Sequence, residues 1–249
     1  MNDMKHIDMA TYPRREHFNH FYSMAYPYAG VTVGVDVTDL LTLCRGKGYS
    51  FYLMVLHAVA LAADEVDEFR RRIDRDGGAA GMKDGYQPDE QERLLTDRPV
   101  KPSTGLAPGK AGIVEYSECP TSHIELKPDG TYAYCTLHHH MPLADYLQKA
   151  EAARVAVREN GSIEEEAEVQ SMYFISTLPW LHYTQLVQPV ACGEESNPRI
   201  TWGKYQPNDK GRVMMPLSVL VHHGLADGVH IARFYEEFDK QVKNICKEA

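Results

Sequence analysis

The chain has 249 residues, a length that one large domain accommodates, and its 43% hydrophobic and 24% charged residues are close to globular averages. These values exclude a disordered chain, a collagen-like repeat and a disulfide-stabilised miniprotein. The formal net charge of −9 repels nucleic-acid phosphates and anionic lipids, and the sequence contains no basic patch that reverses this. We therefore expect one globular domain over residues 1–249, with neither nucleic acid nor membrane as a partner.

The N-terminus and the cysteines predict a cytoplasmic protein. The longest apolar stretch, residues 51–63, is shorter than the about 20 residues that cross a membrane. The chain begins without the apolar segment of a signal peptide. Its 5 cysteines form an odd set without a CxxC pair, which is typical of reduced thiols.

In the first half of the chain, two helices and one insertion stand out. Thr38 is expected to cap a short leucine-containing helix that strands precede. Residues 51–69 are apolar at helical spacing, end in an acidic run, and predict a buried helix. Residues 76–112 are rich in Gly and Pro without a sustained period, which indicates an inserted surface excursion.

The second half predicts further strands and helices. Residues 131–137 alternate after a Pro-Asp-Gly turn and form the second arm of a hairpin. A helix is expected over 143–159, and strands over 172–176 and 214–222. The last helix is amphipathic, with apolar residues at steps of three and four, namely Ile231, Phe234, Phe238, Val242 and Ile245. The alternation of strands and helices predicts an α/β fold.

The loop His222–Gly228 lies between the last strand and the last helix, where a histidine can face a cleft. A purely structural interpretation is also open. Asp227 is well placed as the N-cap of the last helix, and the two glycines suit a turn. Taken alone, the HxxxDG pattern does not decide between the two.

The surrounding segment, VHHGLADGVHIARF at 221–234, resembles the signature of the chloramphenicol acetyltransferase family. Five further blocks occur in the family's order, at residues 12–18, 36–38, 69–70, 175–180 and 200–205. The resemblance covers 12–75 and 113–246, and the insertion has no counterpart. It implies a two-layer α/β sandwich of helices on a mixed β-sheet, assembled as a homotrimer with active sites at the subunit interfaces.

The resemblance also implies a reaction, transfer of the acetyl group of acetyl-CoA to a hydroxyl, with chloramphenicol as the leading acceptor. An imidazole, with a pKa of about 6.5, is a suitable base for a neutral hydroxyl. His223 matches the family's base, its tautomer held by a hydrogen bond from the other ring nitrogen, and His222 is then structural. Ser176 matches the donor to the oxyanion, and Thr201 matches the threonine that holds an ordered water.

Asp227 has two possible roles. A Ser176–His223–Asp227 hydrolase triad is one, but the chain lacks a GxSxG nucleophile elbow. The resemblance instead pairs Asp227 with an arginine that aligns with Arg14, although the adjacent Arg15 leaves the register open. We expect this pair to hold the active-site loop.

Substrate-binding residues follow from the resemblance alone. It places three aromatic residues along the coenzyme tunnel, each also compatible with a core position: Tyr52, Trp180 and Tyr205. Family members can carry a lysine for coenzyme phosphate where this chain has Ser50, and Lys204 or Arg212 could compensate.

The acceptor pocket keeps aromatic character at Phe21, Tyr22 and Tyr26. Gln188 and Arg199, however, fall where apolar residues are expected. A different, more polar alcohol or amine is therefore the alternative acceptor, by the same machinery.

Two alternatives lie outside this enzyme class. His138–His140, with Cys135 and His123, could form a metal cluster, but successive histidines point in different directions and the spacing fits no standard zinc site, so we expect no metal. A family member that binds a ligand without catalysis is the other. The presence together of a base and an oxyanion donor argues against it.

Overall fold

A computed structural model describes residues 3–74, 111–163 and 168–249. The excursion expected at 76–112 lies outside the described residues except for its last two. None of the helices within these ranges combines the length and the apolar composition of a membrane span.

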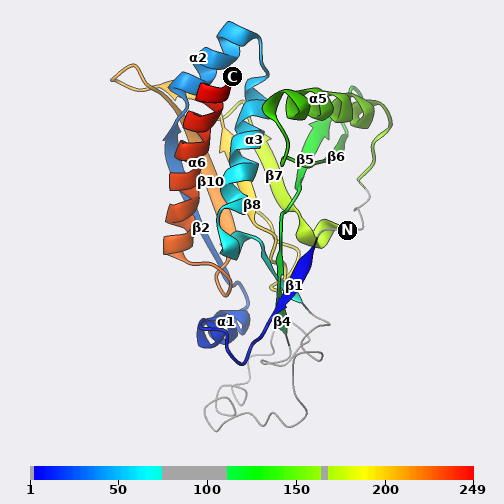
Figure 1. The fold of residues 1–249 in the computed structure, drawn as a ribbon, viewed down its shortest axis with the longest axis vertical. Coiled ribbons are helices and arrows are strands. Elements are labelled where there is room, and N and C mark those ends of the chain that lie inside the picture. Colours follow the sequence, from blue (N-terminus) through cyan, green and yellow to red (C-terminus); the bar gives the residue numbers. More distant parts are fainter. Residues whose placement is uncertain (1–2, 75–110, 164–167) are drawn as a thin grey trace.

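A large mixed sheet forms the centre of the fold, with strand order β2-β10-β8-β7-β5-β6 and β9 paired to β10 (Figure 1). β5, β7 and β8 run parallel to one another, and the other pairs are antiparallel. The strands are β2 (Tyr28–Asp36), β5 (Thr121–Leu126), β6 (Tyr132–Leu137), β7 (Tyr173–Leu178), β8 (Arg199–Gly203), β9 (Gln206–Pro207) and β10 (Val213–His222). The predicted hairpin and both later strands are confirmed.

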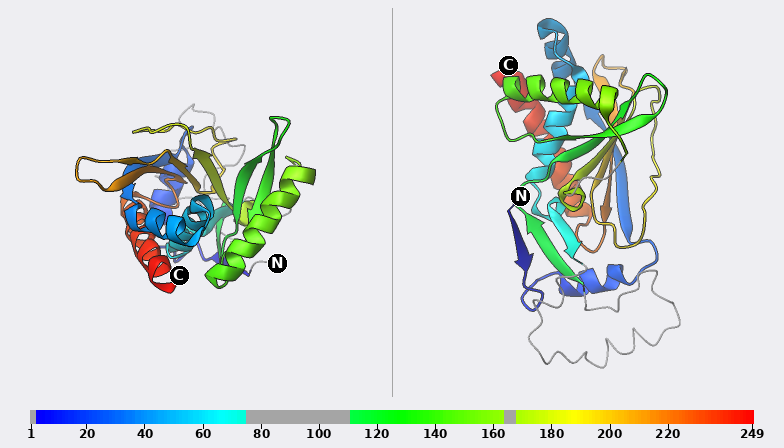
Figure 2. Two further views of the ribbon diagram at one scale, coloured as in Figure 1. Left: turned by 90° about the horizontal axis from the view of Figure 1, so that it is seen from above. Right: turned by 90° about the vertical axis from the view of Figure 1, so that its right-hand side faces the viewer.

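Helices cover one face of this sheet, so the predicted two-layer α/β architecture is confirmed (Figure 2). They are α2 (Thr38–Lys47), α3 (Phe51–Asp64), α5 (Leu143–Asn160) and α6 (Gly228–Glu248). Helix α3 is buried on most of its circumference, as its unbroken apolar sequence predicts. Helix α6 buries the apolar stripe named above and exposes its charged residues.

A second, three-stranded sheet was not predicted. Its order is β1-β4-β3, formed by β1 (Met4–Ile7), β4 (Gly112–Tyr116) and β3 (Arg71–Asp74). Helix α1 (Arg15–Tyr22) lies beside it at one end of the molecule (Figure 1). Strand β1 is short and mostly exposed, so its sequence carries no burial pattern by which to recognise it.

Two sequence expectations about helix ends are corrected. Thr38 is the first residue of α2 and not its cap; its Oγ1 donates to Asp36 Oδ1 (2.6 Å) and accepts from Val213 N (2.8 Å). The helix expected over 51–69 ends at Asp64, and a short 3-10 helix, η1 (Asp67–Phe69), follows. The acidic run therefore begins at the last residue of the helix, a position that the helix dipole disfavours for carboxylates.

Arg72 is a fully buried cation on β3. Its guanidinium donates at 2.6–3.0 Å to the main-chain carbonyls of Phe69, Arg71, Gln170, Ser171 and Met172. Three of these carbonyls belong to the 3-10 helix η3 (Val169–Ser171) and the residue that leads into β7. Arg72 thereby joins the small sheet to the start of a central strand of the large one.

Replacing Arg72 with Met should lower the free energy of unfolding by about 3–5 kcal/mol, because five main-chain carbonyls, three of them in buried contacts, lose their donor. Urea denaturation followed by circular dichroism measures this. Arg212→Met, which removes a half-exposed ion pair with Asp36, is the control and should cost much less. Equal losses in the two variants would contradict the assigned role of Arg72.

His57 predicts a pH dependence of stability. The ring is buried on α3 against Tyr146 (centroids 4.2 Å apart), and burial, with His139 and His140 nearby, lowers its pKa from 6.5 to about 4. Between these two values the unfolded chain binds more protons than the folded one, so stability falls as the pH falls. His57→Phe should remove up to about 1.4 kcal/mol per pH unit from this slope. Thermal unfolding of the wild type and of His57→Phe from pH 7 to pH 4 tests it, and equal slopes in the two proteins would contradict the role of His57.

Candidate active site

The parallel strands β7 and β8 place Ser176 directly beside Thr201. One repeat earlier on the same face, Phe174 lies beside Arg199. The alternate residues of both strands are buried in the core on the helix side, namely Ile175 and Ile200. The pairing of β7 with β8 therefore gives the two strands one face in the core and one face with polar residues.

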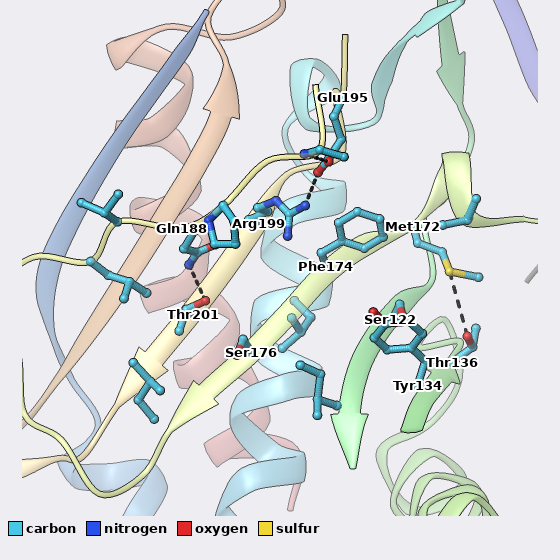
Figure 3. Close-up of a pocket in the computed structure, with 18 residues that line it drawn as sticks. Ser122, Tyr134, Thr136, Met172, Phe174, Ser176, Gln188, Glu195, Arg199 and Thr201 are labelled. Atoms are coloured by element: carbon cyan, nitrogen blue, oxygen red, sulfur yellow. Dashed lines mark hydrogen bonds and ion pairs between the residues drawn. The ribbon is translucent and has the colours of Figure 1, made fainter. Parts of the chain in front are cut away.

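A cavity of about 420 Å³ lies on the polar face (Figure 3). Strands β5, β6, β7 and β8 form one wall, and the segment 179–198, which contains no helix or strand, supplies the other. The lining is mostly apolar but includes Ser176, Thr201, Gln188, Glu195 and Arg199. A largely apolar cavity with a few placed polar groups is typical of a small-molecule site.

The two hydroxyls in this cavity differ in their partners. Thr201 is buried, and its Oγ1 accepts a hydrogen bond from Gln188 Nε2 at 2.6 Å. The hydroxyl of Ser176 is half-buried and has no hydrogen-bond partner among the described residues. Ser176 is therefore free to donate to a ligand, whereas Gln188 fixes the orientation of Thr201.

The two histidines at the end of β10 have different surroundings. His222 is buried; its Nδ1 accepts from Gly224 N (3.1 Å), its Nε2 lies 3.2 Å from the Gly193 carbonyl oxygen, and burial lowers its pKa to about 4. The half-buried His223 stacks on the ring of Phe21, with centroids 3.9 Å apart and planes 8° from parallel. These contacts hold His222 in the framework, whereas the ring of His223 has no hydrogen-bond partner among the described residues.

The expected hydrogen bond that fixes the tautomer of His223 is not formed by the described residues, because its Nδ1 is buried without a partner. His223, Phe21 and the exposed Tyr26 do not line the cavity that holds Ser176. Thr201 pairs with Ser218 on β10, and His222 lies four residues further on, about 13 Å along the strand. A single chain therefore does not assemble a Ser176–His223–Asp227 triad.

Asp227 braces the loop after β10. Its Oδ2 lies 2.5 Å from Arg14 Nη1, so Arg14 and not Arg15 is the arginine that pairs with Asp227. Arg15 is the first residue of α1. Its Oδ1 accepts from Val229 N (3.2 Å), so Asp227 is also the predicted N-cap of α6. Burial alone raises the pKa of Asp227, but the hydrogen bond from Arg14 and the nearby His230 lower it below its usual value.

Asp227→Asn should keep the helix cap and lose the ion pair, so it should lower the melting temperature and the free energy of unfolding by about 1 kcal/mol. Arg14→Met should have a similar effect, and the double variant should add little to either change. Thermal unfolding of the four proteins measures this coupling. Fully additive losses would show that the two residues act separately.

The aromatic residues assigned to the coenzyme tunnel are in different environments. Trp180 is 73% exposed just beyond β7, and Tyr205 is half-buried against the ring of Phe51. Tyr52 packs against the core, near the ring of Trp202 and beneath the guanidinium of Arg154, and burial raises the pKa of its hydroxyl well above the usual value. Tyr52 thus has the surroundings of a core aromatic, and Tyr205 also packs against the edge of the core.

Ser50 is the N-cap of α3, and its side chain accepts from Leu53 N. A serine at this position therefore has a structural role at the start of α3. Arg212 is engaged by Asp36 at 2.6 Å, whereas the exposed Lys204 has no ion pair within the described ranges. Lys204 is therefore the freer cation beside Tyr205.

The histidine-rich segment is divided between carboxylates. His139 and His140 both contact Asp64 Oδ2, at 2.9 and 2.7 Å, and these three residues have their ligand-type atoms within 4.8 Å of one another. His138 instead lies 3.8 Å from Glu118, and His123 lies 3.4 Å from Glu125. The cluster that the sequence left open, with Cys135 and His123, is thus not gathered at one point.

Comparison with known proteins identifies the family. The family model for chloramphenicol acetyltransferase matches residues 1–88 and 115–239, and the chain belongs to this family. It is therefore an acyltransferase.

Similar curated proteins agree with this family. A chloramphenicol acetyltransferase of Proteus mirabilis is 25% identical over 242 residues, 97% of this chain and 95% of the relative. One from Staphylococcus aureus is 24% identical over 240 residues, 95% and 98% of the two chains.

Solved structures share the fold. A chloramphenicol acetyltransferase superposes with a TM-score of 0.77 at 23% identity, covering 96% of this chain and 100% of that one. The dihydrolipoamide acetyltransferase of Azotobacter vinelandii gives a TM-score of 0.59 at 15% identity, covering 94% and 88%.

Proposed function

We propose that the protein transfers the acetyl group of acetyl-CoA to a hydroxyl of a small molecule, with chloramphenicol as the first acceptor to test. Membership of the family supports the reaction class and the acetyl donor. The observation that carries the proposal is the cavity in which Ser176 and Thr201 lie side by side. A cytoplasmic location and a single acetyltransferase domain over residues 1–249 are part of the same proposal.

Ser176 is the proposed donor to the tetrahedral oxyanion, because its hydroxyl has no competing partner in the described part of the chain. Thr201 is proposed to hold an ordered water against the same intermediate. Gln188 is then a positioning residue, since its amide occupies Thr201 Oγ1. No acetyl-enzyme is required, because the acceptor oxygen attacks the thioester directly while coenzyme A leaves with the proton.

The proposed base is His223 of a second copy of the chain. A general base must lie within about 3.2 Å of the proton that it removes, and His223 does not line the cavity of its own chain. A neighbouring copy in a homotrimer would bring His223 to the cavity together with Phe21 and Tyr26. Phe21, stacked on the imidazole, would fix the plane of the ring.

The coenzyme is proposed to lie along Trp180 and Tyr205, with Lys204 available for a phosphate and Tyr52 supporting this wall from the core. The acceptor alternative remains a more polar alcohol or amine, and the polar groups of the cavity wall favour it: Gln188, Glu195 and Arg199. The reaction and the catalytic residues are the same for either acceptor.

Thiol release from acetyl-CoA, measured with chloramphenicol and with a panel of other alcohols and amines, tests the proposal. His223→Ala should lower turnover by ~10²–10⁴ and Ser176→Ala by ~10²–10³, with little loss of stability. His17→Ala, an exposed histidine on α1, is the matched control. Thiol release that persists in His223→Ala would show that His223 is not the base. No thiol release with any acceptor would favour a ligand-binding protein without catalysis.

A mixture of the two inactive variants tests the shared site. If His223 and Ser176 come from different copies, random reassembly of equal amounts should restore about one quarter of wild-type activity, because one interface in four combines both intact residues. A site contained in one chain would give no recovery.

A further inference from the structure

Arg199 and Glu195 form an ion pair inside the wall of the cavity (Figure 3). The guanidinium lies over the ring of Phe174, 5.0 Å from its centroid, and Nη2 donates to Glu195 Oε1. The other carboxylate oxygen of Glu195 accepts from Ala191 N at 2.8 Å. Both partners are therefore held in place, one by a strand and an aromatic ring, the other by the main chain of the segment 179–198.

The ion pair with Glu195 does not use all the N–H donors of the Arg199 guanidinium. Its Nε is buried and has no hydrogen-bond partner among the residues described, and the side chain, 22% exposed, borders the cavity. A buried charged donor without an acceptor is costly in free energy. An oxygen atom of a molecule bound in the cavity can accept a charge-assisted hydrogen bond from the exposed part of the guanidinium, and this would offset part of the cost of burying the charge.

The strand register determines the distance between the Arg199 guanidinium and Ser176, where acetyl transfer is proposed. Arg199 and Phe174 precede Thr201 and Ser176 by two residues on the same face of β8 and β7. With a rise of about 3.3 Å per residue, the two rows are roughly 7 Å apart. If the reacting hydroxyl of a bound molecule lies at Ser176, the atoms of that molecule about 7 Å from this hydroxyl lie next to the guanidinium of Arg199.

The charges of Arg199 and Glu195 limit which ligand group can contact the guanidinium. Glu195 already neutralises Arg199, so the wall carries a dipole and no net charge. A carboxylate on the ligand would lie close to Glu195, and like charges there are unfavourable. An uncharged oxygen can accept from the guanidinium without that repulsion.

We propose that the Arg199–Glu195 pair is a specificity element, which selects acceptors with an uncharged hydrogen-bond-accepting oxygen about 7 Å from the acetylated hydroxyl. A nitro, sulfonyl or amide oxygen meets this description. The inference rests on the proposed acetyl transfer to a hydroxyl in this cavity.

Calorimetric titration of the assembled protein, without acetyl-CoA, tests the inference with chloramphenicol and with analogues whose para-nitro group is replaced by methylsulfonyl, hydrogen or carboxylate. The wild type should bind the nitro and sulfonyl compounds roughly 10- to 100-fold more tightly than the hydrogen compound. Arg199→Met should abolish that ratio, and Glu195→Gln should shift the preference toward the carboxylate. Arg158→Met, which breaks a comparable pair with Glu125 outside the cavity, should keep the wild-type ratio.

An unchanged ratio in Arg199→Met, a wild-type preference for the carboxylate, or no binding of any compound would overturn the inference. Thermal unfolding verifies that each variant is folded, and Arg199→Lys, which retains the charge, should keep part of the ratio. Thiol release with the same compounds separates the two proposals. Selective binding without release would refute acetyl transfer alone, and equal release from all compounds would refute the specificity element alone.

Discussion

The buried guanidinium of Arg72 is the constraint on which the position of the site depends. It binds main-chain carbonyls of η3 and of Met172, immediately before β7. Asn197, two residues before β8, contacts the same segment. Its side-chain amide donates at 2.8 Å to the carbonyls of Val169 and Met172. The two strands that carry Ser176 and Thr201 therefore begin from one clamped point, and their register follows from it.

A second charged group supports the same clamp. Asp64, at the end of α3, accepts from Tyr173 of β7 (2.7 Å) and from Cys119 N (3.2 Å) through one oxygen. Burial alone raises the pKa of Asp64, but the hydrogen bonds from His139 and His140 lower it to about 2. A carboxylate at the C-terminal end of a helix opposes the helix dipole, and these four donors offset that cost.

Periodic segments could be predicted from the sequence, and pairings between distant segments could not. Helices α3 and α6 follow from apolar spacing, and the cap by Asp227 follows from its position before an amphipathic run. Glu195 precedes Arg199 by four residues, but this spacing predicts a pair only on a helix, and the segment is not one. The partners of Thr38 and the sharing of Asp64 by two histidines depend on tertiary packing, which no local pattern encodes. For the residues proposed for catalysis, the family resemblance supplied what periodicity could not.

The division of the cavity between sheet and loop has an evolutionary consequence. The hydroxyls proposed for chemistry are on strands whose opposite face is core, so changes that shift these strands disturb folding. Gln188 and Glu195 are on the segment 179–198, which contributes no strand to the sheet. Mutations in that segment can change the range of molecules accepted while the folding core is preserved, and new substrates can therefore be acquired with few losses of stability.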